Sequence, residues 1–232
     1  MKKAFFSILT AAALLSACCG GPKTASNPNN DTEIEARMRA AGLVDIHDLD
    51  STLAVQLVYA QPYNFMGHTL YHDMNKAFML PEMADMVVRA NKLLKSLRYD
   101  VNLIVYDACR PVSIQWEMYN SVKGTPGEGY VANPELGRGL HNYGAAVDVT
   151  LMDCTGHPLP MGSEYDFFGK EARVDAEAEL LRDGRITIRE YENRLLLRRV
   201  MTEVGFKTIQ SEWWHFNYVT AEEAKATLKL ID

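Results

Sequence analysis

The sequence predicts one α+β domain, in which helices pack on a small and largely antiparallel sheet. Candidate strands and helices are interspersed without a steady strand–helix–strand rhythm, which argues against a parallel sheet. The sequence contains no glycine-rich phosphate-binding loop. The chain has 232 residues, of which 47% are hydrophobic and 23% charged, so it can form one domain with a sizeable core.

The first residues are typical of an export signal. Lys2 and Lys3 precede an apolar stretch, Phe5 to Leu15, that is too short to cross a membrane as a stable helix. The next residues, LSAC, end at Cys18 and resemble the processing site of a bacterial lipoprotein. That resemblance implies cleavage before Cys18 and lipidation of its sulfur and new amino terminus. An ordinary secretory signal is the alternative, and both imply export.

We therefore expect three parts in the chain. Residues 1–17 are predicted to be a lipoprotein signal peptide, residues 18–32 a flexible tether rich in Gly, Pro, Asn, Ser and Thr, and residues 33–232 the catalytic domain. The protein would reside in the cell envelope or periplasm and contact the membrane through the lipid on Cys18 alone. The net charge of -6, without a basic block, argues against a nucleic-acid partner. The oligomeric state stays open.

The first half of the domain mixes helix and strand signals. Residues 33–41 predict a short helix that ends at Gly42, and residues 53–59 (LAVQLVY) predict an early strand. Pro, Asn and Gly in residues 61–71 predict a loop. Pro81 suits the first position of a helix. The residues after it form an apolar stripe at helical spacing, which we expect to be core: Met83, Met86, Val87, Ala90, Leu93, Leu94 and Leu97.

The second half begins with a short apolar run, residues 101–106 (VNLIVY), that predicts a central strand. A helix to about residue 121 and a loop rich in Gly and Pro, residues 124–139, follow it. A strand at 145–152 and a turn at 153–162 come next. The remaining signals predict two helices separated at Asp183-Gly184, a last strand and a closing helix, at residues 171–183, 187–204, 213–218 and 221–229.

Four side chains predict a catalytic metal site. His141 and Asp148 lie on either side of Gly144, and Glu212 and His215 lie in the aromatic segment SEWWHFNY. Two imidazoles and one carboxylate are a three-ligand set for zinc with one position left for water, and Glu212 would be the general base. The alternative is that these are ordinary core and surface residues. Because alternate residues of a strand face opposite sides, Glu212 and His215 can meet one metal only if the chain bends or bulges between them.

Cysteines and the other histidines carry weaker signals. Cys109 and Cys154 flank the predicted metal site and would form a disulfide in an oxidising compartment if their Cα atoms are close enough; two separate thiols are the alternative. The remaining histidines fall in predicted turns and are expected to be surface residues or neighbours of the site, not ligands: His47, His68, His72 and His157.

These residues together resemble the D-alanyl-D-alanine dipeptidase family, which includes the vancomycin-resistance dipeptidase. The metal motifs His141-x6-Asp148 and Glu212-Trp213-Trp214-His215 carry the resemblance. Three further segments resemble the family in the same order along the chain: Tyr59-Ala60 with Asn64-Phe65-Met66-Gly67, Asp107-Ala108-Cys109-Arg110-Pro111, and Pro160 to Phe167 (PMGSEYDF). The resemblance runs from about Leu43 to Tyr218.

The resemblance implies a fold, a substrate and a set of roles. The fold would be that of the zinc D,D-peptidases related to hedgehog domains, and the substrate D-Ala-D-Ala or a related D,D-dipeptide. One Zn²⁺ per chain would be bound by His141, Asp148 and His215, with Glu212 as the base. Arg110 would stabilise the oxyanion, Asp166 would lie near the free amino group of the substrate, and Tyr59 would line the pocket. Alternatives stay open for two of these residues: Arg110 could be a structural ion pair and Asp166 a loop cap.

Two features depart from the family pattern. Family members often have Ser two residues before the first zinc histidine, where this chain has Gly139. The export signal favours turnover or scavenging of wall-derived dipeptides over destruction of newly made dipeptide inside the cell. A D,D-carboxypeptidase that trims peptidoglycan stems, and a zinc-containing wall-binding lipoprotein without turnover, are the competing interpretations. Glu212 argues against the second, because a binding protein needs no base beside its metal.

Overall fold

The computed structural model describes residues 30–232. The predicted signal peptide and Cys18 therefore lie outside the described residues, as does most of the predicted tether. Within residues 30–232, none of the helices combines the length and apolar character needed to span a bilayer.

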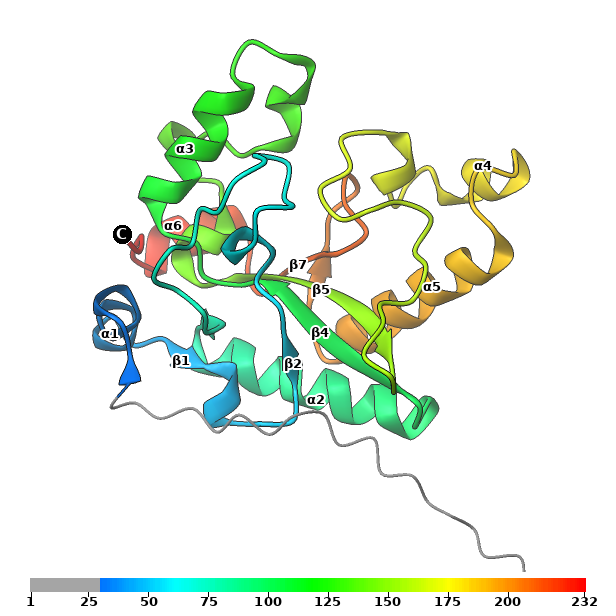
Figure 1. Cartoon of the computed structure of the whole chain (residues 1–232), viewed down its shortest axis with the longest axis horizontal. Coiled ribbons are helices and arrows are strands. Elements are labelled where there is room, and N and C mark those ends of the chain that lie inside the picture. Colours follow the sequence, from blue (N-terminus) through cyan, green and yellow to red (C-terminus); the bar gives the residue numbers. More distant parts are fainter. Residues whose placement is uncertain (1–29) are drawn as a thin grey trace, which may run out of the picture.

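One five-stranded sheet organises the molecule (Figure 1), with the strand order β2-β4-β5-β7-β6. Only β2 and β4 run parallel, and the other neighbours are antiparallel, which confirms the predicted α+β class and the largely antiparallel sheet. The strands of this sheet are β2 (Ala54–Val55), β4 (Val101–Asp107), β5 (Ala146–Asp153), β6 (Lys207–Thr208) and β7 (His215–Asn217). The helices are α1 (Glu33–Ala40), α2 (Pro81–Leu97), α3 (Val112–Val122), α4 (Glu177–Arg182), α5 (Ile188–Glu203) and α6 (Ala221–Thr227).

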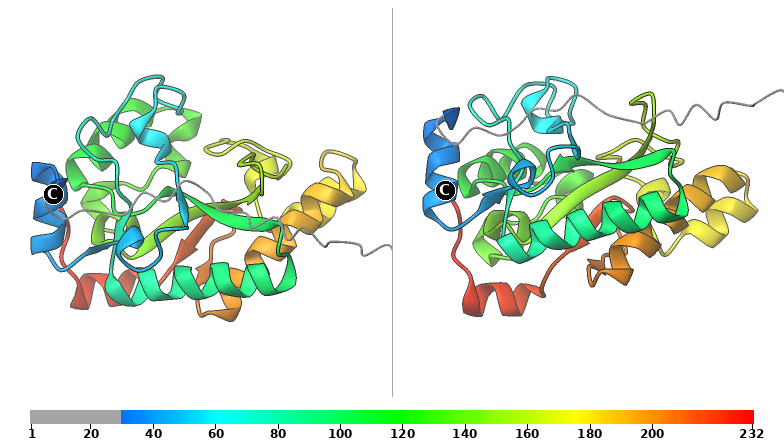
Figure 2. Two further views of the ribbon diagram at one scale, coloured as in Figure 1. Left: turned by 60° about the horizontal axis from the view of Figure 1, so that its bottom comes forward. Right: turned by 90° about the horizontal axis from the view of Figure 1, so that it is seen from below.

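The two faces of the sheet have different roles. Helices α2 and α5 cover one face, whereas α3 and long loops lie over the other, as Figure 1 and Figure 2 show. Along β5, Val147, Val149 and Leu151 are buried in the main core, and Asp148 and Thr150 between them face the opposite side. The period of two along this central strand therefore puts apolar side chains under the helices and Asp148 among the loops.

The amino-terminal part of the domain contains a second, two-stranded sheet, in which β1 (Val44–Asp45) pairs with β3 (Phe78–Met79).

The folded part of the chain begins before the predicted domain boundary at residue 33. Asp31 forms ion pairs with Arg39 and Lys76, both at 2.5 Å, and the side chain of Thr32 caps α1 in a capping box. Asp31 and Thr32 belong to the packed domain because these contacts join them to it.

Of the predicted elements that are shorter in the structure, the strand at 53–59 and the helix at 171–183 differ most from the prediction. The last strand, predicted at 213–218, is His215–Asn217, and the closing helix, predicted at 221–229, is Ala221–Thr227. The strand predicted at 53–59 pairs only at Ala54–Val55, after which the chain turns into a short 3-10 helix, Val58–Ala60. The helix predicted from residue 171 begins at Glu177. The backbone before Glu177 is bound elsewhere, because Val174 N–H donates to the carbonyl of Gln210 and the carbonyl of Ala172 accepts from Trp213 N–H. Tertiary hydrogen bonds replace helical ones in that stretch.

The predicted disulfide between Cys109 and Cys154 is wrong, because neither cysteine forms a disulfide within residues 30–232; Cys109 is buried and Cys154 exposed. Cys109 follows the end of β4, while Val101 at the start of β4 pairs with Asp153. The antiparallel register thus places the two cysteines at opposite ends of β4. At a rise of about 3.3 Å per residue they are roughly 20 Å or more apart, far beyond the reach of a disulfide.

Candidate active site

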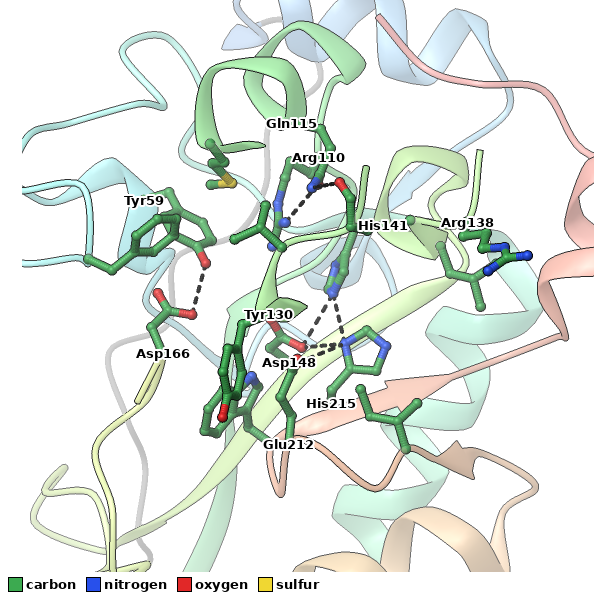
Figure 3. A pocket seen from close by; sticks show the side chains of 18 of the residues that line it. Tyr59, Arg110, Gln115, Tyr130, Arg138, His141, Asp148, Asp166, Glu212 and His215 are labelled. Atoms are coloured by element: carbon green, nitrogen blue, oxygen red, sulfur yellow. Dashed lines mark hydrogen bonds and ion pairs between the residues drawn. The ribbon is translucent and has the colours of Figure 1, made fainter. Parts of the chain in front are cut away.

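The three predicted metal ligands come together on the loop-covered side of the sheet (Figure 3). Asp148 and His215 are a direct cross-strand pair of β5 and β7, and His141 lies in the 3-10 helix η6 (Leu140–Tyr143). His141 Nε2 is 3.2 Å from His215 Nδ1 and 3.3 Å from Asp148 Oδ1. His215 Nδ1 is 3.0 Å from Asp148 Oδ1. One nitrogen or oxygen of each side chain therefore converges on a common point.

The chemistry of these three atoms fits a bound cation. The outer nitrogen of His141, Nδ1, lies 2.6 Å from the carbonyl oxygen of Ala108 and must donate to it. The outer nitrogen of His215, Nε2, is 2.7 Å from Asn217 Oδ1. With those protons placed, the inner nitrogens of neutral imidazoles present lone pairs to each other and to Asp148. Tetrahedral zinc with bonds of about 2.0–2.1 Å spaces its ligand atoms about 3.3 Å apart, which matches the observed distances.

Neighbouring side chains hold these ligands in place. The hydroxyl of Tyr165 donates to Asp148 Oδ2 at 2.8 Å, so one carboxylate oxygen is engaged and the other faces the histidines. Asn217 supports His215 from the same strand, two residues further along. Such partners orient metal ligands and fix the histidine tautomers. Tyr165 and Asn217 both lie inside the sequence motifs, but the motifs predicted no role for either residue; for Asn217, the strand period of two was the available signal.

Charge at this cluster also favours a cation. Burial would raise the pKa of Asp148, but the adjacent His141 and His215 hold it well below its usual range. Burial lowers the pKa of His215, yet Asp148, Glu212 and Asn217 outweigh it and raise the pKa to about 9. The surroundings therefore stabilise positive charge at the point where the three ligands meet.

Glu212 lies beside this cluster as the sequence predicted. Its Oε2 is 3.9 Å from His215 Nδ1, and its side chain lines the same cavity. Glu212 is outside β7, which begins at His215, so the bend required to bring both side chains to one side is present. Burial raises the pKa of Glu212 above its ordinary value, with Asp148 adding to the effect, which makes the carboxylate a better proton acceptor.

Arg110 forms the ion pair that the sequence left open as an alternative, and it also lines the cavity. Its Nε and Nη2 donate to Asp107 Oδ2 at 3.0 and 2.5 Å, and its Nη1 donates to Gln115 Oε1 at 2.9 Å. The guanidinium is buried, stacks over the ring of Tyr59 at 5.0 Å, and lines the cavity. Asp107 is fully buried and also accepts from the Tyr71 hydroxyl at 2.8 Å. The ion pair thus fixes the position of a buried positive charge in the wall of the cavity.

Asp166 and Tyr59 lie across the cavity from the histidines (Figure 3), and the Tyr59 hydroxyl donates to Asp166 Oδ1 at 3.0 Å. Among residues 30–232, Asp166 is the one non-glycine residue with a positive φ, at 59°. Its Oδ2 is buried and has no hydrogen-bond partner within the described residues. Burial, followed by the charge of Asp148, raises the pKa of Asp166 well above its usual range. Asp166, which lines the cavity, thus combines a left-handed backbone conformation with a buried carboxyl oxygen that has no hydrogen-bond partner within the described residues.

The chain is similar to known dipeptidases over most of its length. A sequence model described as D-ala-D-ala dipeptidase matches residues 39–230. The D-alanyl-D-alanine dipeptidase of Escherichia coli (strain K12) is 30% identical over 174 residues, which cover 75% of this chain and 83% of the relative. The D-alanyl-D-alanine dipeptidase of Enterococcus faecium is 29% identical over 178 residues, covering 68% and 82% of the two chains.

The chain belongs to the D-Ala-D-Ala dipeptidase family. It is a peptidase, and its fold is that of the family. A third relative, the D-alanyl-D-alanine dipeptidase of a Synechocystis strain, is 26% identical over 158 residues, or 56% of this chain and 64% of the relative.

The cavity is small, and three aromatic rings form part of its wall. It has a volume of about 200 Å³. Phe168 stacks on Tyr130 with ring centroids 5.1 Å apart and an interplanar angle of 14°, and it contacts Phe65 at the same centroid distance. The three rings come from three separate segments, with Tyr130 at the end of the 3-10 helix Pro126–Tyr130, and they line the same cavity. Because the segments are far apart in sequence, periodicity gave no sign that they meet.

Glycine is required at two positions near the proposed ligands, for different structural reasons. Gly144 has a φ of 65°, and a Cβ there would lie 2.8 Å from Leu43 Cδ2, so the end of η6 needs glycine. At Gly139, where the family often has Ser, a Cβ would lie 2.6 Å from Asn142 Oδ1. Asn142 is buried and donates to the Arg110 carbonyl at 2.8 Å. The position of the Asn142 side chain therefore leaves no room for a side chain at residue 139 in this chain.

Proposed function

We propose that this peptidase is a zinc-dependent D,D-dipeptidase that hydrolyses D-alanyl-D-alanine and similar dipeptides in the cell envelope. The observation that carries the proposal is the convergence of three lone-pair atoms, from His141, Asp148 and His215, within 3.3 Å of one another. Membership of the D-Ala-D-Ala dipeptidase family supports the substrate class.

His141, Asp148 and His215 would hold the zinc ion, one per chain. Bound zinc supplies a Lewis acid that lowers the pKa of a water molecule and polarises the scissile carbonyl. Tyr165 and Asn217 keep the ligands oriented through hydrogen bonds of 2.8 and 2.7 Å.

Glu212 and Arg110 carry the charge changes of the reaction. Glu212 accepts a proton from the attacking water and later donates it to the amine that leaves, because its carboxylate lies beside the ligand cluster. Arg110 stabilises the negative charge that develops on the carbonyl oxygen of the substrate. Its hydrogen bonds to Asp107 and Gln115 fix the guanidinium before the substrate arrives, so little reorganisation is needed.

Asp166 and Tyr59 would select the amino end of the substrate. The unpartnered Oδ2 of Asp166 is suited to a hydrogen bond from the free ammonium group of a dipeptide. A longer peptide has an amide at that position and leaves Asp166 unpaired, which disfavours it. The aromatic rings and the 200 Å³ volume of the cavity favour small substrates for the same reason.

The location of the protein is proposed from the sequence alone. The positive start, the apolar stretch and Cys18 favour export and lipid anchoring of residues 18–232, with a short tether before the domain. An envelope location fits a role in the turnover or scavenging of wall-derived dipeptides.

One experiment tests the proposal. The purified protein is analysed for metal, and hydrolysis of D-Ala-D-Ala is measured with and without a chelator. We expect about one zinc per chain and loss of hydrolysis on chelation that returns with added zinc. A stem pentapeptide is assayed in parallel. Faster cleavage of the pentapeptide would favour a D,D-carboxypeptidase, and zinc binding without hydrolysis of either substrate would favour a binding lipoprotein.

A further inference from the structure

The cavity has a second cationic side chain that the proposed mechanism does not use. Arg110 and Arg138 are the arginines that line it. Arg110 is committed to Asp107 and Gln115, whereas Arg138 is exposed and forms neither an ion pair nor a hydrogen bond with any of residues 30–232. The carboxylates that line the cavity are Asp148, Asp166 and Glu212, and each has a role at the ligand cluster or at the amino end. The charge of Arg138 is therefore uncompensated at the cavity rim.

The backbone holds Arg138 in a defined place. Gly137 before it has a φ of 54°, and its carbonyl accepts from the Tyr143 hydroxyl at 3.1 Å. The carbonyl of Gly139 after it accepts from Asn142 N–H at 3.1 Å. Two anchored glycines thus fix the Cα of Arg138, while its side chain keeps the freedom of an exposed residue. Residue 139 is glycine, so no side chain at that position separates Arg138 from the ligand cluster.

Arg138 and Asp166 lie on opposite sides of the ligand cluster, with His141, Asp148 and His215 between them (Figure 3). A dipeptide whose scissile carbonyl is at the cluster has its ammonium group on one side and its carboxylate on the other. Standard backbone dimensions put these two charges about 6–7 Å apart in an extended dipeptide. If Asp166 receives the ammonium group, the carboxylate is directed to the side on which Arg138 lies. In Figure 3 the guanidinium of Arg138 points away from the ligand cluster, so this exposed side chain turns inward to meet the carboxylate.

We propose that Arg138 binds the C-terminal carboxylate of the dipeptide substrate and thereby selects peptides that end one residue after the scissile bond. This inference rests on the proposed function. A guanidinium matches a carboxylate with two parallel hydrogen bonds, which a point charge does not reproduce. Asp166 and Arg138 together would make the cavity complementary to both charges of a small zwitterion.

The position of Arg138 predicts which kinetic constant changes. Its side chain is at the exposed rim and binds a group that keeps its charge throughout the reaction, so it stabilises the ground state and the transition state equally. Loss of such uniform binding raises KM and leaves kcat nearly unchanged. Salt screens an exposed pair, so the contribution of Arg138 decreases as ionic strength rises.

The test compares D-Ala-D-Ala with its C-terminal amide, which lacks the negative charge. For Arg138→Ala we expect kcat/KM on the free acid to fall about tenfold, mainly through KM, and kcat/KM on the amide to change less than about twofold. Arg138→Lys should recover part of the loss. Lys225→Ala is a matched control, since a Cβ on Gly137 would lie 3.4 Å from Lys225 Cε, yet Lys225 does not line the cavity. It should affect both substrates alike.

The possible results separate this inference from the proposed function. An equal loss on acid and amide, or no loss on either, overturns the role of Arg138 while leaving the dipeptidase function intact. A wild-type protein that binds zinc but hydrolyses neither substrate overturns the proposed function and the inference with it. A discrimination between acid and amide that persists in Arg138→Ala assigns the carboxylate to another group.

Discussion

The two ends of the cavity are built differently. At the metal end, each ligand has an outer hydrogen-bond partner: the Ala108 carbonyl for His141, Asn217 for His215 and Tyr165 for Asp148. At the other end, Asp166 is in a loop with a φ of 59° and has a buried oxygen without a partner in the described part of the chain. The side chains proposed to hold the metal are thus oriented by partners within the protein, whereas Asp166 Oδ2 has none in the described part of the chain, and the ammonium group of the proposed substrate would supply one.

The largest expected effect concerns catalysis at the metal end. Glu212→Ala should lower kcat by on the order of 10²–10⁴, as expected for loss of a general base. Zinc content should stay the same because Glu212 is not one of the three converging ligands. Steady-state kinetics and metal analysis of the same preparation measure both quantities. Retained activity would show that another group takes the proton.

Arg110→Ala should lower kcat by about 10²–10³, as loss of an oxyanion donor does. It should also reduce the free energy of unfolding by roughly 3–5 kcal/mol, because Asp107 is left buried without its cationic partner. Denaturant unfolding beside the kinetics separates the two effects. The double variant Asp107→Asn/Arg110→Ala should regain stability without regaining turnover. A variant with normal kcat and a raised KM would contradict the oxyanion role.

Asp166→Asn tests the other end of the cavity. Asparagine tolerates the left-handed conformation, so the loop should keep its path. We expect kcat/KM for D-Ala-D-Ala to fall about 10- to 100-fold, since a charged hydrogen bond to the ammonium group is lost. N-acetylated D-Ala-D-Ala, which lacks that group, should be hydrolysed by wild type and variant at similar low rates. An equal loss on both substrates would indicate that Asp166 only shapes the loop.

Tyr165→Phe removes the hydrogen bond to Asp148 Oδ2 and leaves the ring in place. Changes to such supporting partners cost about 10–100-fold in metal affinity, and we expect the lower end because the other ligands keep their partners. Competition with a chelator of known affinity measures the change. Asn217→Ala should behave similarly, and unchanged zinc affinity in both variants would mean that the metal end does not depend on its outer partners.

The smallest expected effect is a gain in stability in Asp166→Asn. Burial raises the pKa of Asp166 in the folded protein, so the folded state binds more protons than the unfolded state between the ordinary and the raised pKa. The wild-type protein therefore loses stability as pH rises through that range, and the variant does not. Thermal or denaturant unfolding without substrate should show the variant to be more stable at neutral pH, with the difference vanishing below about pH 4. Equal stability at both pH values would contradict this reading of Asp166.

Much of the fold was predictable because its signals are local. Pro81 and the apolar stripe after it marked α2, and the alternation of residues 145–152 marked β5. The predictions failed where long-range contacts override local preference, as at residues 171–176, whose backbone bonds to residues 210–213. The disulfide failed for a related reason, since only the register of β4 and β5 shows that Cys109 and Cys154 lie at opposite ends of a strand.

The sequence by itself determined which chemical groups this peptidase has and which class of reaction suits them, because imidazoles and carboxylates in recognisable segments keep their chemistry wherever the chain places them. The tertiary structure decided how those groups are used. Asp107 is a buried anchor for Arg110, Tyr165 and Asn217 orient the proposed metal ligands, and Arg138 at the cavity rim has no partner among residues 30–232. Such roles depend on distances between residues far apart in sequence, and packing alone sets those distances.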